Sequence, residues 1–139
     1  MKEKLISYNT ARLAKEKGFN EPCTYWNDGE QETMFVGHRM DSTLTNSDID
    51  NNPFYKRIPF SCTIPTQALL QKWLREKYEL ELWVQPVVEG IPEYEAYKEY
   101  KYIYLGFSRK TGEGFSGGSK NASFEKTLEI GLQEALDLI

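Results

Sequence analysis

The chain has 139 residues, the length of one domain, and its 40% hydrophobic and 27% charged residues are typical of a globular protein. Its aromatic content of 14% argues against a disordered chain, because disordered segments are poor in aromatic residues. Its formal net charge of −4 argues against a general nucleic-acid binder, because contacts with phosphates require a basic surface.

The first predicted element is a helix over about Tyr8 to Lys17. Ser7 can cap its start, and Ile6 before the cap can pack back onto the first turns. Gly18 stands where a helix end favours left-handed backbone, and Phe19 can fold back on the last turn. This helix therefore has a sequence signal at both ends.

A hairpin and a polar loop are predicted next. The segments Cys23 to Trp26 and Thr33 to Val36 are strand-like, and the turn signal Asn27-Asp28-Gly29 lies between them. The stretch at about 41–57 is rich in Asp, Asn, Ser and Thr and lacks periodicity, so we expect a long exposed loop there. A short apolar run, Phe60 to Ile64, leads to the second helix.

The second helix is predicted over about Thr66 to Tyr78, because its apolar residues recur at helical spacing. Thr66 or Thr63 can cap it. Leu80 to Val84 alternates apolar and other side chains, which predicts a half-buried strand. Pro86 disfavours the continuation of this strand in the middle of a sheet.

A long strand is predicted over Tyr97 to Ser108, and it has two different faces. One face carries residues expected in the core: Ile103, Leu105 and Phe107. The other face carries tyrosines: Tyr100, Tyr102 and Tyr104. Trp83 on a neighbouring strand can extend this second face. A glycine-rich loop follows from Thr111 to Ala122, and Ser123 caps a last amphipathic helix.

The element order α-β-β-α-β-β-α predicts an α+β fold. Short links within each strand pair favour antiparallel pairing. A single antiparallel sheet of about four strands, with the three helices packed on one face, is the simplest arrangement. We therefore expect a single domain over residues 1–139, with the polar loop at about 41–57.

The sequence lacks the patterns of metal sites and of nucleophilic catalysis. His38 is the one histidine, and Cys23 and Cys62 are 39 positions apart, so the close ligand pairs of a zinc site are missing. No local signature supports a Cys–His dyad. We expect two buried free cysteines, no metal, no cofactor and no enzymatic activity.

Neither a membrane span nor an export signal is indicated. No apolar run approaches the roughly 20 residues of a membrane helix. The start MKEKLISYNT lacks the apolar stretch of a signal peptide. We expect a cytoplasmic protein without membrane contacts.

The most specific candidate site is a basic, glycine-rich stretch. Residues 96–120 carry five basic and two acidic side chains. Gly112 to Gly117 matches GxGxxG, but the parallel βαβ context of a dinucleotide site is missing. Basic side chains and backbone N–H groups near a helix start can nevertheless bind an anion. The alternative is a surface turn without a ligand.

We predict that a small phosphate-bearing ligand binds in this region. The basic residues expected to hold its phosphate are Arg109, Lys110 and Lys120. The aromatic residues expected to stack on its base are Tyr102 and Tyr104. The alternative for the tyrosine face is that a helix covers it, and an exposed tyrosine face would favour a homo-oligomer, most simply a two-fold dimer.

Three segments carry a family resemblance: TARLAKEKGF (10–19), PTQALLQKWLRE (65–76) and LEIGLQEAL (128–136). They resemble a family of small phage and prophage proteins that is frequent in the Bacteroides group. The resemblance brings no binding or catalytic residues. It implies an accessory protein of a mobile element that acts in the cytoplasm of an infected bacterium.

Together these patterns predict a non-enzymatic, phage-type binding protein. Its expected role is to sequester a small anionic, nucleotide-like ligand, which would disarm a host defence that signals through nucleotides. The alternative is a protein–protein interaction module, either a virion component or an inhibitor of a host protein.

Overall fold

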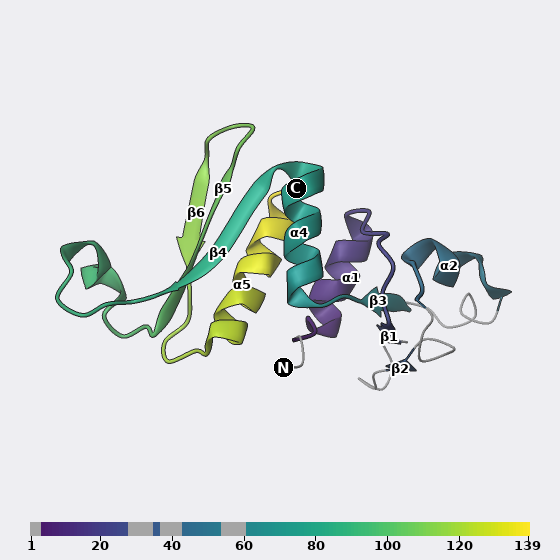
Figure 1. The fold of residues 1–139 in the computed structure, drawn as a ribbon, viewed down its shortest axis with the longest axis horizontal. Coiled ribbons are helices and arrows are strands. Elements are labelled where there is room, and N and C mark those ends of the chain that lie inside the picture. The colour runs from purple at the N-terminus through teal and green to yellow at the C-terminus, as the bar shows by residue number, and fades with distance from the viewer. Residues whose placement is uncertain (1–3, 28–34, 37–42, 54–60) are drawn as a thin grey trace. The chain divides into compact units, whose positions relative to one another are not determined.

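The computed structural model describes residues 4–27, 35–36, 43–53 and 61–139, and it has an α+β fold, as predicted. The chain divides into two compact units, Met1–Leu69 and Leu70–Ile139. Over the described ranges, each unit contains a three-stranded antiparallel sheet together with helices (Figure 1). The prediction of a single four-stranded sheet is therefore wrong, because each predicted strand pair forms a separate sheet with a third strand.

The sheet of the first unit has the order β2 (Phe35–Val36), β1 (Tyr25–Asn27), β3 (Cys62–Ile64). The middle strand β1 is antiparallel to both neighbours, so the predicted pairing of β1 with β2 is confirmed. The Asp28-Gly29 part of the predicted turn lies outside the described residues. The apolar run before the second helix supplies β3, which is the third strand.

Helix α1 (Tyr8–Glu16) packs against β3 and has both of the ends that its sequence predicts. The hydroxyl of Ser7 accepts a hydrogen bond from the Thr10 N–H at 3.3 Å. Gly18 has a φ of +95°, the left-handed conformation that favours glycine. Phe19 is buried and folds back on the helix, since its N–H bonds to a carbonyl of the last turns.

The polar loop predicted at about 41–57 contains a helix, α2 (Asn46–Asn51), so this stretch is not a structureless loop. A capping box starts the helix. The hydroxyl of Thr45 accepts from the Asp48 N–H at 3.1 Å, and the Asp48 carboxylate accepts from the Thr45 N–H at 2.9 Å. Reciprocal capping therefore replaces the apolar periodicity that usually marks a helix.

Buried contacts hold α2 in the first unit. The Asn46 side chain donates to the Phe19 carbonyl at 2.7 Å and accepts from the Thr63 N–H at 2.9 Å. Ile49 is buried in one cluster with Trp26. Buried polar groups need hydrogen-bond partners, and both the donor and the acceptor end of this amide have one.

Helix α4 (Gln67–Tyr78) matches the predicted second helix, and Thr66 caps it through a 3.1 Å bond from the Leu69 N–H. The boundary between the two units falls within its first turn. Trp73 is 5% exposed and belongs to the core.

The sheet of the second unit has the order β4 (Leu80–Pro86), β5 (Tyr102–Ser108), β6 (Gly114–Gly117), and β5 is antiparallel to both neighbours. The strand predicted over Leu80 to Val84 is confirmed and is two residues longer. Pro86 is tolerated because it ends an edge strand, where a missing N–H costs least.

The long strand predicted over Tyr97 to Ser108 is too long, since it begins only at Tyr102. A 3₁₀ helix, η1 (Pro92–Tyr97), lies before it. The Tyr94 hydroxyl accepts a hydrogen bond from the Gln85 side chain at 2.6 Å. The Tyr97 hydroxyl lies 3.3 Å from the Ser116 hydroxyl. These bonds tie η1 to the sheet and so prevent an extended chain there.

The glycine-rich loop predicted over Thr111 to Ala122 contains strand β6 and is therefore not a continuous loop. A Cβ on Gly106 would collide with the ring of Phe115, which stands opposite it on β6. A glycine that makes room for an aromatic ring on the next strand stabilises a pair of strands. Of the GxGxxG glycines, Gly117 likewise makes room for a ring, that of Tyr104, and Gly114 lies on β6, so this part of the pattern reflects packing within a sheet.

Helix α5 (Phe124–Asp137) packs on β4 and β5, and Ser123 caps it as predicted (Figure 1). The prediction of which face of β5 forms the core is wrong in part. Tyr104 is buried against α5, whereas Phe107 on the opposite face is 36% exposed. Alternation along a strand predicts two faces but not which face a helix covers.

The ring of Tyr104 lies between two glycines. A Cβ on Gly117 would stand 2.5 Å from the Tyr104 hydroxyl oxygen, and a Cβ on Gly131 would stand 2.9 Å from Tyr104 Cγ. The hydroxyl donates to the Glu134 carboxylate. Burial, with this hydrogen bond as a second cause, raises the pKa of Tyr104 far above its usual value. One ring thus joins β5, β6 and α5.

Of the described residues, none belongs to a helix that is both long enough and apolar enough to cross a membrane.

Replacing Gly131 by Ala tests this packing through the sign of its effect on stability. Alanine is favoured over glycine in a helix by about 1 kcal/mol, so an unobstructed site would gain stability. We expect instead a loss of about 1–3 kcal/mol in the free energy of unfolding, because the new methyl group meets Tyr104 and Leu82. Urea unfolding measures this change in the free energy of unfolding. Lys126→Ala, on the exposed side of α5, is the control. A stabilised Gly131→Ala protein would contradict the packing.

Candidate functional site

The five residues predicted to bind a ligand do not form one site. Arg109 follows the end of β5 where Ser108 pairs with Leu80, whereas Tyr102 begins β5 at the opposite end of the sheet. A strand of this length spans about 20 Å. Arg109 and Tyr102 are therefore too far apart to contact one small ligand.

Arg109 and Tyr104 already have partners outside any common site. The Nε of Arg109 lies 3.2 Å from a carboxylate oxygen of Glu81, and its guanidinium donates to the Arg75 carbonyl at 3.0 Å. The Tyr104 hydroxyl bonds to Glu134 beneath α5, so its ring is not available to stack on a base. Lys110 is exposed in the turn after β5, on the same end of the sheet as Arg109.

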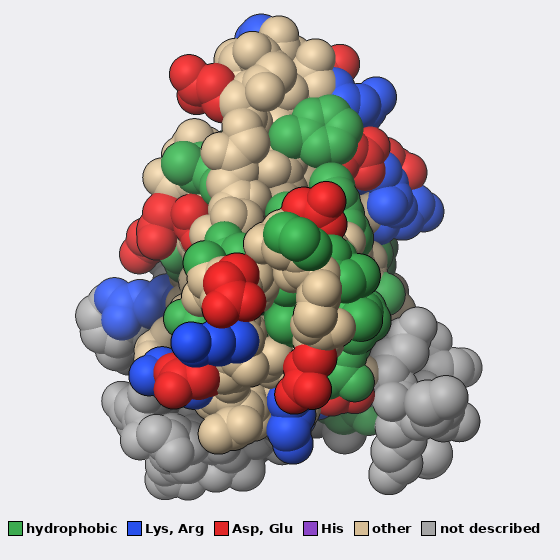
Figure 2. Space-filling view, turned by 90° about the vertical axis from the view of Figure 1, so that its left-hand side faces the viewer, with side chains coloured by type: hydrophobic (Ala, Val, Ile, Leu, Met, Phe, Trp, Pro, Cys, Tyr) green, Lys and Arg blue, Asp and Glu red, His purple; other side chains and the backbone are tan. Residues whose placement is uncertain are grey.

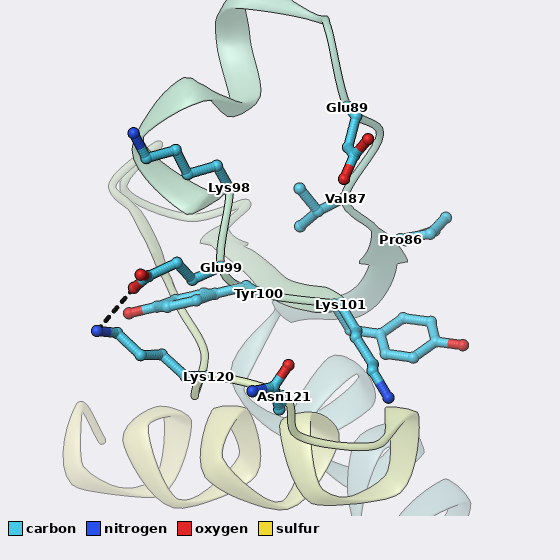
Figure 3. A pocket seen from close by; sticks show the side chains of 10 residues that line it. Pro86, Val87, Glu89, Lys98, Glu99, Tyr100, Lys101, Lys120 and Asn121 are labelled. Atoms are coloured by element: carbon cyan, nitrogen blue, oxygen red, sulfur yellow. Dashed lines mark ion pairs between the residues drawn. The ribbon is translucent and has the colours of Figure 1, made fainter.

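The structure brings the other two predicted residues, Tyr102 and Lys120, together at a pocket of about 650 Å³ in the second unit. Four charged side chains that the sequence did not single out also line it: Glu89, Lys98, Glu99 and Lys101. The ring of Tyr100 lies between the side chains of Glu99 and Lys120 at one side of this pocket (Figure 3). The candidate site thus contains three lysines, two glutamates and two tyrosines.

The pocket forms where the chain leaves the sheet after β4 and returns to it before β5. The Val87 N–H donates to the Lys101 carbonyl at 3.0 Å, which closes the base of this excursion. The Tyr100 N–H donates to the Tyr97 carbonyl at 2.8 Å, so η1 fixes where Tyr100 stands. Lys120 and Asn121, just before α5, supply the third side.

A glycine lets this third side approach the tyrosine. A Cβ on Gly118 would lie 3.0 Å from the Tyr102 carbonyl oxygen and 3.2 Å from Cδ2 of Tyr100. A side chain at this position would require the Tyr102 backbone or the Tyr100 ring to move by a few tenths of an ångström. The glycine-rich segment therefore contributes to the site by making room for rings, rather than by surrounding a phosphate.

One ion pair lies within the pocket. The Nζ of Lys120 is 2.7 Å from a carboxylate oxygen of Glu99, and their side chains are 67% and 61% exposed (Figure 3). Lys98 and Lys101 are exposed and form no ion pair with any residue that the structure describes. Two of the three lysine charges are therefore balanced only by solvent.

On the face drawn in Figure 2, the charges are mixed rather than grouped by sign. Basic and acidic side chains alternate there, with hydrophobic side chains between them. A continuous basic surface, which a nucleic-acid backbone requires, is missing from that face. The pocket is therefore better suited to a small anion than to a polymer of phosphates.

The sequence contained a signal for the residues that were missed. Lys98, Glu99, Tyr100 and Lys101 are consecutive and lie in the basic stretch 96–120. They were assigned to a strand, which directs alternate side chains to opposite faces. The break between η1 and β5 instead brings all four to one pocket, and this break depends on hydrogen bonds of η1 with distant residues.

A second exposed feature lies on the sheet face opposite α5. The rings of Trp83 and Phe107 are in edge-to-face contact, with centroids 6.0 Å apart, and they are 40% and 36% exposed. The prediction that Trp83 extends the tyrosine face is therefore wrong. Trp83 pairs with Leu105, so it lies on the face opposite to that of Tyr104.

The two cysteines are free and buried, as predicted. Burial raises the pKa of Cys23 to about 11 and that of Cys62 to about 12, so both are neutral thiols at physiological pH. Activated cysteines have lowered pKa values, so these two lack the character of nucleophiles. His38, the other member of the dyad considered from sequence, lies outside the described residues.

Comparisons with models of known protein families, with curated proteins and with solved structures find no match to this chain. The resemblance to phage proteins therefore stays a prediction, and function is argued from the pocket.

The buried thiols predict a loss of stability at alkaline pH. Their pKa values in the folded protein are above the ordinary value of 9.0, so the unfolded chain loses these protons first as pH rises. Their contribution is fully present below about pH 9 and is lost as the pH rises toward about 12. Urea unfolding across this range should show a steeper decline for wild type than for Cys23→Ala with Cys62→Ala. Equal slopes would mean that the thiols are not buried.

Proposed function

We propose that this chain is a non-enzymatic binding protein whose pocket holds a small anionic, nucleotide-like ligand. The observation that supports this most directly is that Lys98, Lys101, Lys120 and Tyr100 all line one pocket, with the ammonium groups of Lys98 and Lys101 on different sides of it (Figure 3). Arg109, Lys110 and Tyr104, which the sequence suggested as ligand contacts, are left out of the proposed site.

The lysines would supply the charge that a phosphate group needs. Hydrogen bonds from an ammonium group to a phosphate oxygen are about twice as strong as those between neutral groups. Lys98 and Lys101 require little rearrangement to form them, because their charges face solvent. A phosphate can therefore be bound without breaking an existing ion pair at these two residues.

The tyrosine would supply a surface for a planar group. Stacking of a base on an aromatic ring contributes about 1–3 kcal/mol and tolerates any base. The ring of Tyr100 lines the pocket, and the pocket volume of about 650 Å³ lies within the range usual for small-molecule sites. These two features favour a ligand with both a ring and a phosphate over a simple inorganic anion.

The biological setting follows from the sequence resemblance alone. A phage-type accessory protein would act in the cytoplasm of an infected bacterium, and a nucleotide-binding pocket would let it sequester a host signalling nucleotide. A homo-oligomer stays part of this proposal, although its original motive, an exposed tyrosine face, is weakened by the burial of Tyr104 beneath α5.

A protein-interaction module is the second candidate function, and the exposed Trp83–Phe107 pair favours it. Tryptophan and other aromatic residues are enriched among the residues that dominate binding at protein interfaces. Under this alternative, the sheet face opposite α5 would contact the partner, and the lysines of the pocket would contribute nothing.

Calorimetry with mono-, di- and cyclic nucleotides tests the pocket. We expect wild type to bind at least one with a dissociation constant below about 100 μM. Lys98→Ala with Lys101→Ala should weaken this binding by about tenfold or more, since two charged contacts are lost.

Lys110→Ala is the matched control, because Lys110 is an exposed lysine at the other end of the sheet. It should change the affinity less than about twofold. Absence of binding to every nucleotide, or equal losses in the two variants, would exclude the pocket and favour the interaction module.

A further inference from the structure

Glu99 already forms an ion pair with Lys120, one of the three lysines of the pocket. Its carboxylate lies 2.7 Å from the Nζ of Lys120, in the position that an anionic group of a ligand would take. We infer that Glu99 is an internal counter-ion, and that the pocket takes ligands with two adjacent anionic groups, as in a diphosphate. This inference rests on the proposed function, since it specifies the ligand of the same pocket.

The ion pair is weak enough for a ligand to displace. Both side chains are more than half exposed, and exposed pairs are screened by water and contribute little to stability. Glu99 lies in the short junction between η1 and β5, which keeps its backbone beside the segment that carries Lys120. Glu99 is thus a tethered competitor that a ligand must replace, at a modest loss of affinity.

The number of charges on the ligand decides whether replacement is favourable. A ligand with one negative charge can bind the unpaired Lys98 or Lys101 and leave Lys120 with Glu99. A diphosphate can place one phosphate near Lys98, which lies on the same side of the pocket as the ion pair, and use the other to replace Glu99 at Lys120 (Figure 3). Binding of a diphosphate therefore depends on Lys120, whereas binding of a single phosphodiester does not.

This difference identifies the chemical class of the ligand. Inorganic pyrophosphate and nucleoside diphosphates or triphosphates carry the required adjacent groups. Cyclic mononucleotides carry a single phosphodiester charge. Because Tyr100 adds a surface for a base, a nucleoside diphosphate should bind more tightly than pyrophosphate, and both should bind more tightly than a cyclic mononucleotide.

The test is calorimetry with pyrophosphate, ADP and cyclic AMP on the full chain. Lys120→Gln should weaken the binding of ADP and of pyrophosphate by about fivefold, and it should change the affinity for cyclic AMP by less than about twofold. Glu99→Gln should tighten ADP by about two- to fivefold, the factor that corresponds to one exposed ion pair. When Lys120 is already replaced by Gln, Glu99→Gln should no longer tighten ADP binding, because Glu99 then has no lysine with which to pair.

Glu89→Gln is the matched control, because Glu89 lines the same pocket but forms no ion pair with the residues that the structure describes. Any effect that it has on affinity should be the same with and without Lys120→Gln. Circular dichroism checks that each variant is folded.

The outcomes separate this inference from the proposed function. One outcome would overturn the counter-ion inference alone. ADP binding would weaken with Lys98→Ala and Lys101→Ala, but Glu99→Gln would change the affinity equally in wild type and in the Lys120→Gln protein. If cyclic AMP binds as tightly as ADP, the inferred preference for ligands with two adjacent anionic groups is wrong. A folded wild type that binds none of the three probes would overturn both the inference and the proposed function.

Discussion

The ring of Tyr104 fixes the second unit, because it occupies the space that side chains at Gly117 and Gly131 would need. Its position on the middle strand β5 brings β6 close on one side and α5 close on the face beneath. The hydroxyl ends at Glu134, so the one polar atom of the ring has a partner where it is buried. Close packing of one ring against two glycines is sensitive to any added methyl group, which makes this contact a constraint on three elements at once.

The pocket depends on the same arrangement. Tyr102 lies two residues before Tyr104 on β5, and Lys120 lies three residues after Gly117, in the segment that leads to α5. When Tyr104 holds β5 against β6 and α5, the start of β5 and the start of α5 come together. Gly118 then lets the chain pass close to Tyr100. The lysines of the site are exposed, but the backbone that carries them is positioned by the packing of two tyrosines on glycines.

The sequence predicts those parts of the fold whose signals are local. The three main helices begin near the predicted residues, because Ser7, Thr66 and Ser123 cap them through neighbouring N–H groups. Helix α2 was missed because its anchors, Asn46 and Ile49, contact residues far away in the sequence. The same limit explains the candidate site. Lys120 and Tyr102 were found from charge and aromatic content, whereas Arg109 and Tyr104 were misplaced because their partners Glu81 and Glu134 lie on other elements.

The most direct test of the account is an amide NMR titration of the folded chain with ADP. The account predicts that shifts concentrate at residues 98–102 and 120–121, which line the pocket, and that residues 109–112 at the other end of the sheet change little. Shifts centred on Arg109 and Lys110 would contradict the pocket and restore the site suggested by the glycine-rich sequence. An unchanged spectrum at millimolar ADP would contradict anion binding by this pocket altogether.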